Sequence, residues 1–129
     1  MSELKRILYA EDEPDIQEVA KVALETLGDL ELYICNNGDE ALENAVSYAP
    51  DLLLFDVIMP GMDGPSTLKA IKELPELVNT PAIFMTANVE PTVVAEYKKL
   101  GVIDVIGKPF DPMTLAEQIK AIWRQHCGE

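Results

Sequence analysis

The sequence predicts an α/β domain in which five helices surround a five-stranded parallel sheet. Short apolar runs alternate with amphipathic segments from one end of the chain to the other. Most of these runs show no polar alternation, which is typical of strands buried on both faces of a parallel sheet. At 129 residues the chain has the size of one domain, and we expect residues 1–129 to form it without a second domain.

The five expected strands are runs of four or five mainly apolar residues. They cover residues 7–10, 32–35, 52–55, 82–85 and 102–106. Runs of this length are too short for helices and match ordinary strands. A parallel arrangement with right-handed crossovers follows, because a helical pattern separates each run from the next.

The five expected helices are recognised by apolar residues that recur at helical spacing. They cover residues 16–27, 42–49, 68–74, 93–100 and 115–123. Glycine or proline separates the segments, at positions 28, 38, 50, 61, 64, 81, 101 and 109. The pair Asp111–Pro112 is typical of an N-cap followed by proline in the first helical turn, so we expect the last helix to begin there.

Composition excludes several classes of protein. The net charge is −13, from 23 acidic and 10 basic residues, whereas nucleic-acid binding needs a basic surface. No apolar run approaches the ~20 residues of a membrane span, and residues 1–14 carry charges where a signal peptide has its apolar segment. We expect a cytoplasmic protein with no membrane or nucleic-acid partner. Cys35 and Cys127 match no metal-binding spacing and are expected to be reduced thiols.

Polar side chains follow four of the five expected strands. They are Glu11, Asp12 and Glu13 after the first strand, Asp56 after the third, Thr86–Ala87 after the fourth and Lys108–Pro109 after the fifth. The carboxyl ends of parallel strands share one edge of the sheet, where ligands bind in open α/β folds. We therefore expect acids, a hydroxyl and an ammonium to converge there. Glu13 is better read as part of the exposed start of a helix than as a ligand.

Such a cluster suits phosphoryl chemistry. Carboxylates held close together repel one another unless a cation intervenes, and oxygen ligands favour a hard cation, Mg²⁺ first and Mn²⁺ as a substitute. A lysine and a threonine opposite the metal suit the remaining oxygens of a phosphoryl group. An aspartate can itself be the nucleophile and form an aspartyl phosphate.

The motifs resemble those of response-regulator receiver domains of two-component signalling, over essentially the whole chain. They are the acidic pair Glu11–Asp12, the D-x-x-M-P-G-M-D-G run from Asp56 to Gly64, Thr86–Ala87, and Lys108–Pro109–Phe110. The resemblance implies a flavodoxin-like doubly wound (βα)5 fold with strand order 2-1-3-4-5. It also implies a stand-alone receiver, since the expected single domain leaves no room for an output domain.

The resemblance assigns the metal site to four residues. Asp56 is the implied phosphoacceptor. Asp12 and Asp56 would bind Mg²⁺ directly, together with the backbone carbonyl of Ile58, and Glu11 would act through a metal-bound water. An apolar Ile58 beside the expected path of the hydrolytic water predicts slow dephosphorylation.

The resemblance assigns the phosphoryl oxygens to the other strand ends. Lys108 would bind them, with a cis peptide to Pro109, and Thr86 would donate its hydroxyl while Ala87 leaves space. One position departs from the family pattern, because Val105 stands where an aromatic residue is usual. We hypothesise that the surface of the fourth helix, fifth strand and fifth helix still responds, through helix and loop shifts.

The implied function is a phosphorylation-operated switch that catalyses only its own phosphorylation and dephosphorylation. Its donor would be a phosphohistidine on a histidine kinase or histidine phosphotransfer protein, and its output would be binding to a downstream protein. The alternative is a degenerate receiver that binds proteins irrespective of phosphorylation. A phosphatase of the haloacid-dehalogenase type would need a second aspartate at Ile58, and a flavodoxin would need a Ser/Thr/Gly-rich loop after the first strand.

Each site residue also has a plain structural interpretation. Asp56 could cap the turn that follows it, Lys108 could be an ordinary surface lysine, and Thr86 could be a buried strand residue. The joint occurrence of all three at strand ends favours the functional interpretation.

Overall fold

The computed structural model describes residues 3–127, and five parallel strands form one sheet in this part of the chain. The strands are β1 (Arg6–Ala10), β2 (Glu31–Cys35), β3 (Leu52–Asp56), β4 (Ala82–Thr86) and β5 (Val102–Gly107). They are arranged in the order β2-β1-β3-β4-β5, and every neighbouring pair is parallel. The predicted sheet and its order are confirmed, and each strand is one residue longer than expected.

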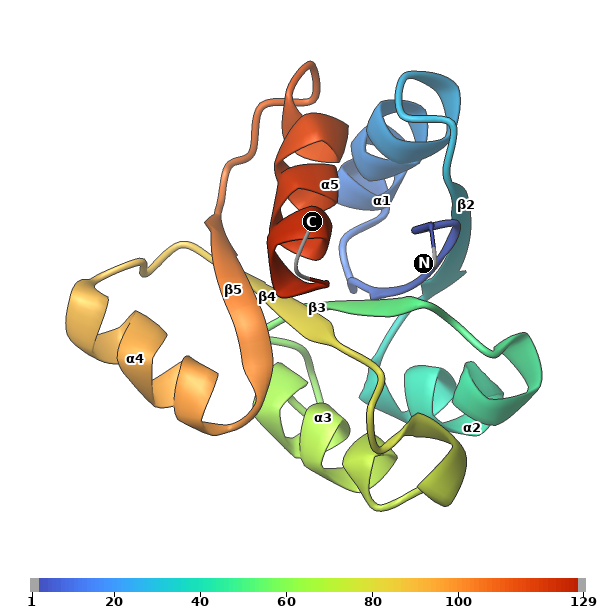
Figure 1. Ribbon diagram of the computed structural model, residues 1–129, viewed down its shortest axis with the longest axis vertical. Coiled ribbons are helices and arrows are strands. Elements are labelled where there is room, and N and C mark those ends of the chain that lie inside the picture. The colour runs from blue at the N-terminus through green and yellow to red at the C-terminus, as the bar shows by residue number, and fades with distance from the viewer. Residues whose placement is uncertain (1–2, 128–129) are drawn as a thin grey trace.

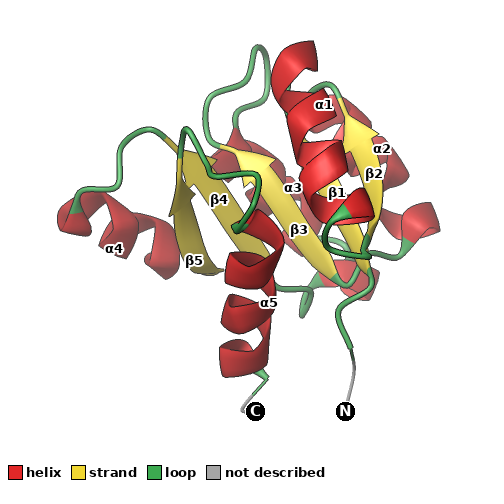
Figure 2. Cartoon of the chain, turned by 90° about the horizontal axis from the view of Figure 1, so that it is seen from above, coloured by secondary structure: helices red, strands yellow, loops and turns green. Residues whose placement is uncertain are grey.

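Helices lie on both faces of this sheet (Figures 1 and 2). The described residues form α1 (Pro14–Lys21), α2 (Gly38–Tyr48), α3 (Gly64–Lys72), α4 (Pro91–Lys99) and α5 (Leu115–His126). A π-helical segment, Val22–Thr26, continues α1, and a 3-10 turn, Pro75–Leu77, follows α3. One face is covered by α1 and α5 and the other by α2 and α3, with α4 beside β5 at the sheet edge. None of the described helices is long and apolar enough to cross a membrane.

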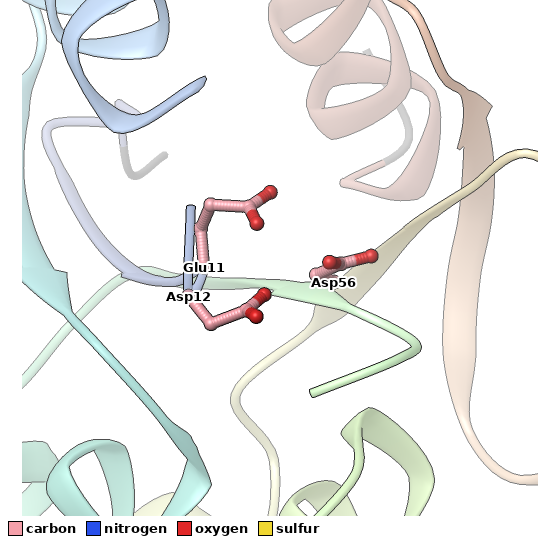
Figure 3. Close-up of side chains that lie close together, drawn as sticks. All are labelled: Glu11, Asp12 and Asp56. Carbon is pink, nitrogen blue, oxygen red and sulfur yellow. The ribbon is translucent and has the colours of Figure 1, made fainter. Parts of the chain in front are cut away.

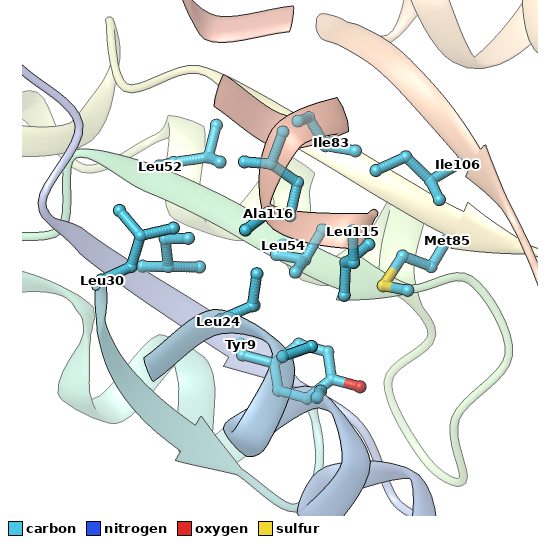
Figure 4. Close-up of a cluster of buried hydrophobic side chains, with 14 of the residues drawn as sticks. Tyr9, Leu24, Leu30, Leu52, Leu54, Ile83, Met85, Ile106, Leu115 and Ala116 are labelled. Atoms are coloured by element: carbon cyan, nitrogen blue, oxygen red, sulfur yellow. The ribbon is translucent and has the colours of Figure 1, made fainter. Parts of the chain in front are cut away.

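Two hydrophobic clusters hold the helices against the sheet. Alternate residues of β1 point to opposite faces, so Ile7 and Tyr9 join the cluster under α1 and α5, while Leu8 and Ala10 join the one under α2 and α3. Figure 4 shows Tyr9 in the first of these clusters. Every residue of β3 and β4 is buried. Full burial of a large apolar side chain stabilises a fold by about 1.5–3 kcal/mol, so these central strands are rigid supports for the residues at their ends.

Helix α5 begins at Leu115, and the expected start at Asp111–Pro112 is therefore wrong. Residues 112–114 form a separate turn. The Asp111 carboxylate accepts a hydrogen bond from the Met113 amide at 2.9 Å, and the Asp111 carbonyl accepts one from the Leu115 amide at 3.0 Å. An aspartate followed by proline suits such a turn as well as a helix N-terminus, which explains the error.

Candidate functional site

Three carboxylates meet at the carboxyl ends of the strands. Glu11 and Asp12 follow β1, and Asp56 is the last residue of β3. Figure 3 shows their side chains lying close together. One oxygen from each of the three lies within 4.8 Å of the others. The structure thus brings together the acids that were expected to converge.

Lys108 links the two strands that carry these acids. Its Nζ lies 3.0 Å from Oε1 of Glu11 and 3.2 Å from Oδ2 of Asp56. The Lys108 side chain is 15 % exposed, and that of Glu11 is fully buried. The peptide between Lys108 and Pro109 is cis. The second oxygen of Glu11 accepts a hydrogen bond from the Glu13 amide at 3.2 Å, so both of its oxygens are engaged by protein donors.

The pKa shifts of this pair have opposing causes. Burial raises the pKa of the Glu11 carboxyl, the hydrogen bond from Lys108 lowers it, and the charge of Asp56 raises it again, leaving it above its ordinary value. Burial alone would lower the pKa of Lys108. The hydrogen bond to Glu11 and the charges of Asp56 and Glu11 outweigh burial, so the Lys108 pKa lies above its usual range. Lys108 is therefore firmly protonated and is the main support for a charged Glu11.

Thr86 ends β4 beside the carboxylates and is buried. Its hydroxyl accepts a hydrogen bond from the Asn88 amide at 3.2 Å, and its carbonyl accepts one from the Lys108 amide at 2.9 Å. A hydroxyl that accepts one bond can still donate its own proton. The neighbouring Ala87 is exposed, and so is Ile58, at 79 %. Val105 lies further from the site, half-buried against the cluster under α2 and α3.

The loop after Asp56 is clamped by a close approach of backbone to backbone. Gly64 begins α3, and its amide donates to the Val57 carbonyl at 2.9 Å. A Cβ at Gly64 would lie only 2.6 Å from the carbonyl oxygen of Asp56, a distance that side chains do not tolerate. Asp63 caps α3 by accepting a hydrogen bond from the Ser66 amide at 2.8 Å. The glycine therefore lets the helix start directly behind the phosphoacceptor candidate.

Two residues of the site were missed by the sequence analysis. Gln17 on α1 donates hydrogen bonds to the backbone carbonyl of Glu11 and to Oδ1 of Asn36, and so fixes the loop after β1. Tyr9 lies two residues before Glu11 with a fully buried side chain. Burial raises the Tyr9 pKa above its ordinary value, and the charges of Glu11 and Asp56 raise it further, so the phenol is neutral. In the sequence, Tyr9 could have been noticed as a tyrosine within the otherwise aliphatic run of residues 7–10.

The acidic cluster fits a small hard cation. Ligand oxygens around octahedral Mg²⁺, each about 2.1 Å from the ion, lie roughly 3–4.2 Å apart. The three carboxylate oxygens lie within 4.8 Å of one another, a spacing that fits direct binding by Asp12 and Asp56 with Glu11 bound through a metal-bound water. The donor set contains oxygen only, as Mg²⁺ and Mn²⁺ prefer.

Comparison with known sequences points to one family. The family model for the response regulator receiver domain matches residues 7–120. The chain is 37 % identical over 112 residues to Regulatory protein AtoC of Escherichia coli strain K12, covering 86 % of this chain and 23 % of AtoC. It is 35 % identical over 121 residues to the phosphate regulon transcriptional regulatory protein PhoB of Pseudomonas aeruginosa, covering 94 % of this chain and 52 % of PhoB. The chain thus spans about half, or less, of the length of these relatives.

Comparison with solved structures agrees. The chemotaxis response regulator CheY4 of Vibrio cholerae superposes with a TM-score of 0.85 at 28 % identity, over 92 % of this chain and 98 % of CheY4. The signal receiver domain of a signal transduction histidine kinase from Syntrophus aciditrophicus gives a TM-score of 0.79 at 33 % identity, over 94 % of this chain and 91 % of that domain's chain. Both similarities cover more than nine-tenths of this chain.

Proposed function

Because this chain belongs to the response regulator receiver domains, the phosphorylation switches of two-component systems, we propose that Asp56 accepts the phosphoryl group in a Mg²⁺-dependent reaction. The observation that supports this most directly is the position of Asp56 at the end of a fully buried strand. It lies there beside two further carboxylates and 3.2 Å from the Lys108 ammonium. An aspartate placed among metal ligands and a cation is suited to nucleophilic attack on phosphorus.

Asp12 and Asp56 would hold the metal together with the backbone carbonyl of Ile58. Glu11 would act through a metal-bound water, because Lys108 and the Glu13 amide already engage both of its oxygens. When bound, Mg²⁺ or Mn²⁺ neutralises charge and orients phosphoryl oxygens. Ile58 exposes an apolar side chain beside this site, which fits a slow hydrolytic step.

The transfer step uses the remaining strand ends. An Asp56 carboxylate oxygen attacks the phosphorus of a phosphohistidine on a histidine kinase or phosphotransfer protein, and the phosphorus–nitrogen bond breaks with its electron pair moving to the imidazole. Lys108 turns from the carboxylates to a phosphoryl oxygen, and Thr86 donates its hydroxyl to another, with Ala87 leaving space beside it. Later attack by water on the same phosphorus breaks its bond to the Asp56 oxygen, which restores the carboxylate and releases inorganic phosphate.

The output is proposed to be binding of a downstream protein by residues 1–129 acting as one receiver unit. Helix α4 has no buried residue and lies beside β5 at the edge of the sheet. Such packing supports a response of the α4–β5–α5 surface through helix and loop shifts, despite Val105 in place of an aromatic ring. Backbone NMR shifts recorded with and without a phosphoryl analogue test this, and an unchanged α4–β5–α5 surface would contradict it.

The proposal is tested by intact mass after incubation with acetyl phosphate, in the presence of Mg²⁺ or of a chelator. We expect the mass of one phosphoryl group to be added only with the metal, and to be lost in Asp56→Asn. Asp63→Asn is the matched control, because Asp63 caps α3 close by in the sequence and takes no part in the cluster. No added mass would indicate a silent site, and so a protein-binding module that works without phosphorylation. Added mass that survives Asp56→Asn would show that another residue is the phosphoacceptor and that Asp56 is misassigned.

A further inference from the structure

The hydroxyl of Tyr9 is buried without a hydrogen-bond partner. Among the buried side-chain nitrogen and oxygen atoms of residues 3–127, the Tyr9 hydroxyl oxygen is the one that has no hydrogen-bond donor or acceptor in suitable geometry. Its ring packs fully buried among the aliphatic side chains under α1 and α5, as Figure 4 shows. Burying a hydroxyl without a partner is unfavourable. A phenylalanine would fill the same space without that cost. We therefore expect the hydroxyl to form a hydrogen bond in another state of the site.

The position of Tyr9 indicates what that role involves. Residues two apart in a strand point to the same side, so Tyr9 and Glu11 share the face covered by α1 and α5. The charges of Glu11 and Asp56 both act on the phenol, while its hydroxyl has no partner in hydrogen-bonding geometry. A neutral phenol is a hydrogen-bond donor. The Glu11 carboxylate is the acceptor that a small movement would bring to it.

The need for such a donor arises when Lys108 leaves Glu11. In the structure the Lys108 ammonium supplies the bond to Oε1 at 3.0 Å, and the Glu13 amide supplies the bond to Oε2 at 3.2 Å. Once Lys108 turns to a phosphoryl oxygen, Oε1 of this fully buried carboxylate loses its side-chain donor, and the Glu13 amide and a metal-bound water would be the donors left to Glu11. A buried carboxylate is less stable with fewer donors, so an additional donor would stabilise Glu11 in this state.

We propose that Tyr9 is a positioning residue, whose hydroxyl donates a hydrogen bond to the Glu11 carboxylate when Lys108 moves to the phosphoryl group. The inference rests on the proposed function, since the phosphoryl group is what draws Lys108 away. Tyr9 touches neither phosphoryl group nor metal. It holds the Glu11 carboxylate in place, and so favours the phosphorylated state over the unphosphorylated one.

Tyr9→Phe tests the proposal, because the exchange removes only the oxygen. The matched control is Tyr48→Phe. The Tyr48 hydroxyl donates a hydrogen bond to the Glu31 carbonyl at 3.4 Å, near the opposite, amino-terminal end of the sheet. The phosphoryl analogue is beryllium fluoride with Mg²⁺. Thermal unfolding is recorded with chelator and with the analogue, the affinity for the analogue is titrated, and the tyrosine Raman doublet reports hydrogen bonding of the phenol.

With chelator, Tyr9→Phe should unfold at the wild-type temperature or above it, because no hydrogen bond is lost. Its affinity for beryllium fluoride should fall about ten-fold, as expected for the loss of one hydrogen bond to a charged group. Tyr48→Phe should bind as wild type does. The wild-type Raman doublet should shift to the donor pattern on adding the analogue, and this shift should vanish from the spectrum of Tyr9→Phe.

Two results would overturn the inference while leaving the proposed function intact. One is a Tyr9→Phe protein that binds the analogue as wild type does. The other is a protein that is equally destabilised with and without the analogue, which would show a purely structural tyrosine. If wild type itself fails to bind beryllium fluoride with Mg²⁺, the proposed function fails first and the inference fails with it.

Discussion

Replacing Lys108 by methionine is expected to lower the free energy of unfolding by about 3 kcal/mol at neutral pH without metal. Methionine keeps an unbranched chain of similar length, so the main loss is the ammonium 3.0 Å from the fully buried Glu11 carboxylate. Removing one partner of a buried ion pair costs about 3–5 kcal/mol. The lower value applies because Glu11 keeps the Glu13 amide, and because a carboxyl whose pKa is already raised can take up a proton.

The size of this effect should depend on pH in a defined direction. Without Lys108, burial and the charge of Asp56 raise the folded-state pKa of Glu11 further above its unfolded value of about 4.3. At a pH below the unfolded-state pKa, Glu11 is neutral in both the folded and the unfolded protein, so the loss of stability caused by a charged, unpaired Glu11 is absent. The deficit grows as the pH rises through the folded-state pKa and is complete above it. The loss caused by Lys108→Met should therefore be small near pH 4 and largest at neutral pH and above.

Urea unfolding with chelator, repeated across this pH range, measures the effect. Glu11→Gln combined with Lys108→Met should recover much of the stability, because no buried carboxylate remains. Lys99→Met is the control, since the Lys99–Glu96 pair is 74 % and 71 % exposed and its loss should be barely detectable. Equal losses at pH 4 and at neutral pH, or no recovery in the double variant, would refute the reasoning.

Three further outcomes are expected from other parts of the structure. Gly64→Ala should lower the free energy of unfolding by about 1–3 kcal/mol, because the new Cβ would meet the Asp56 carbonyl oxygen at 2.6 Å; an unchanged urea midpoint would contradict this. Ile58→Asn should leave stability unchanged, since Ile58 is exposed, and should shorten the phosphoryl lifetime several-fold by admitting water, as followed by intact mass over time. Burial raises the pKa of Cys35 to about 12, so at pH 8 only about one thiol in 10,000 is ionised; native protein treated with iodoacetamide should be alkylated at the exposed Cys127, and modification at Cys35 would contradict the burial argument.

The fold was predictable because hydrophobic periodicity records burial directly. The runs at β3 and β4 are apolar throughout because both faces of these strands are covered. The π-helical segment Val22–Thr26 was not predictable, since the apolar spacing of Ala23 and Leu24 suits an α-helix equally well. The start of α5 was misplaced because Asp111 hydrogen-bonds a local turn in place of the helix.

The site was predictable at the level of which residues converge, and not at the level of how they pair. Topology alone brings the ends of β1, β3, β4 and β5 to one edge, so Asp56, Thr86 and Lys108 were found from their positions. The Lys108 ammonium lies closer to Glu11 than to Asp56, and this difference depends on the rotamers of the side chains and on how deeply each is buried. No sequence pattern encodes either quantity, and the contacts of Tyr9 were hidden for the same reason.

The charges of the site argue for the order in which its ligands arrive. At their formal charges, the three carboxylates and the Lys108 ammonium give the cluster a net charge of about −2. Like charges about 4 Å apart repel by about 4 kcal/mol at an effective dielectric constant of 20. An incoming phosphoryl group would meet this repulsion from more than one carboxylate, and Lys108 can offset only part of it. A divalent cation held by Asp12 and Asp56 would remove it, so we expect the metal to bind before the phosphoryl group. A phosphorylation rate that saturates with Mg²⁺ is the kinetic consequence.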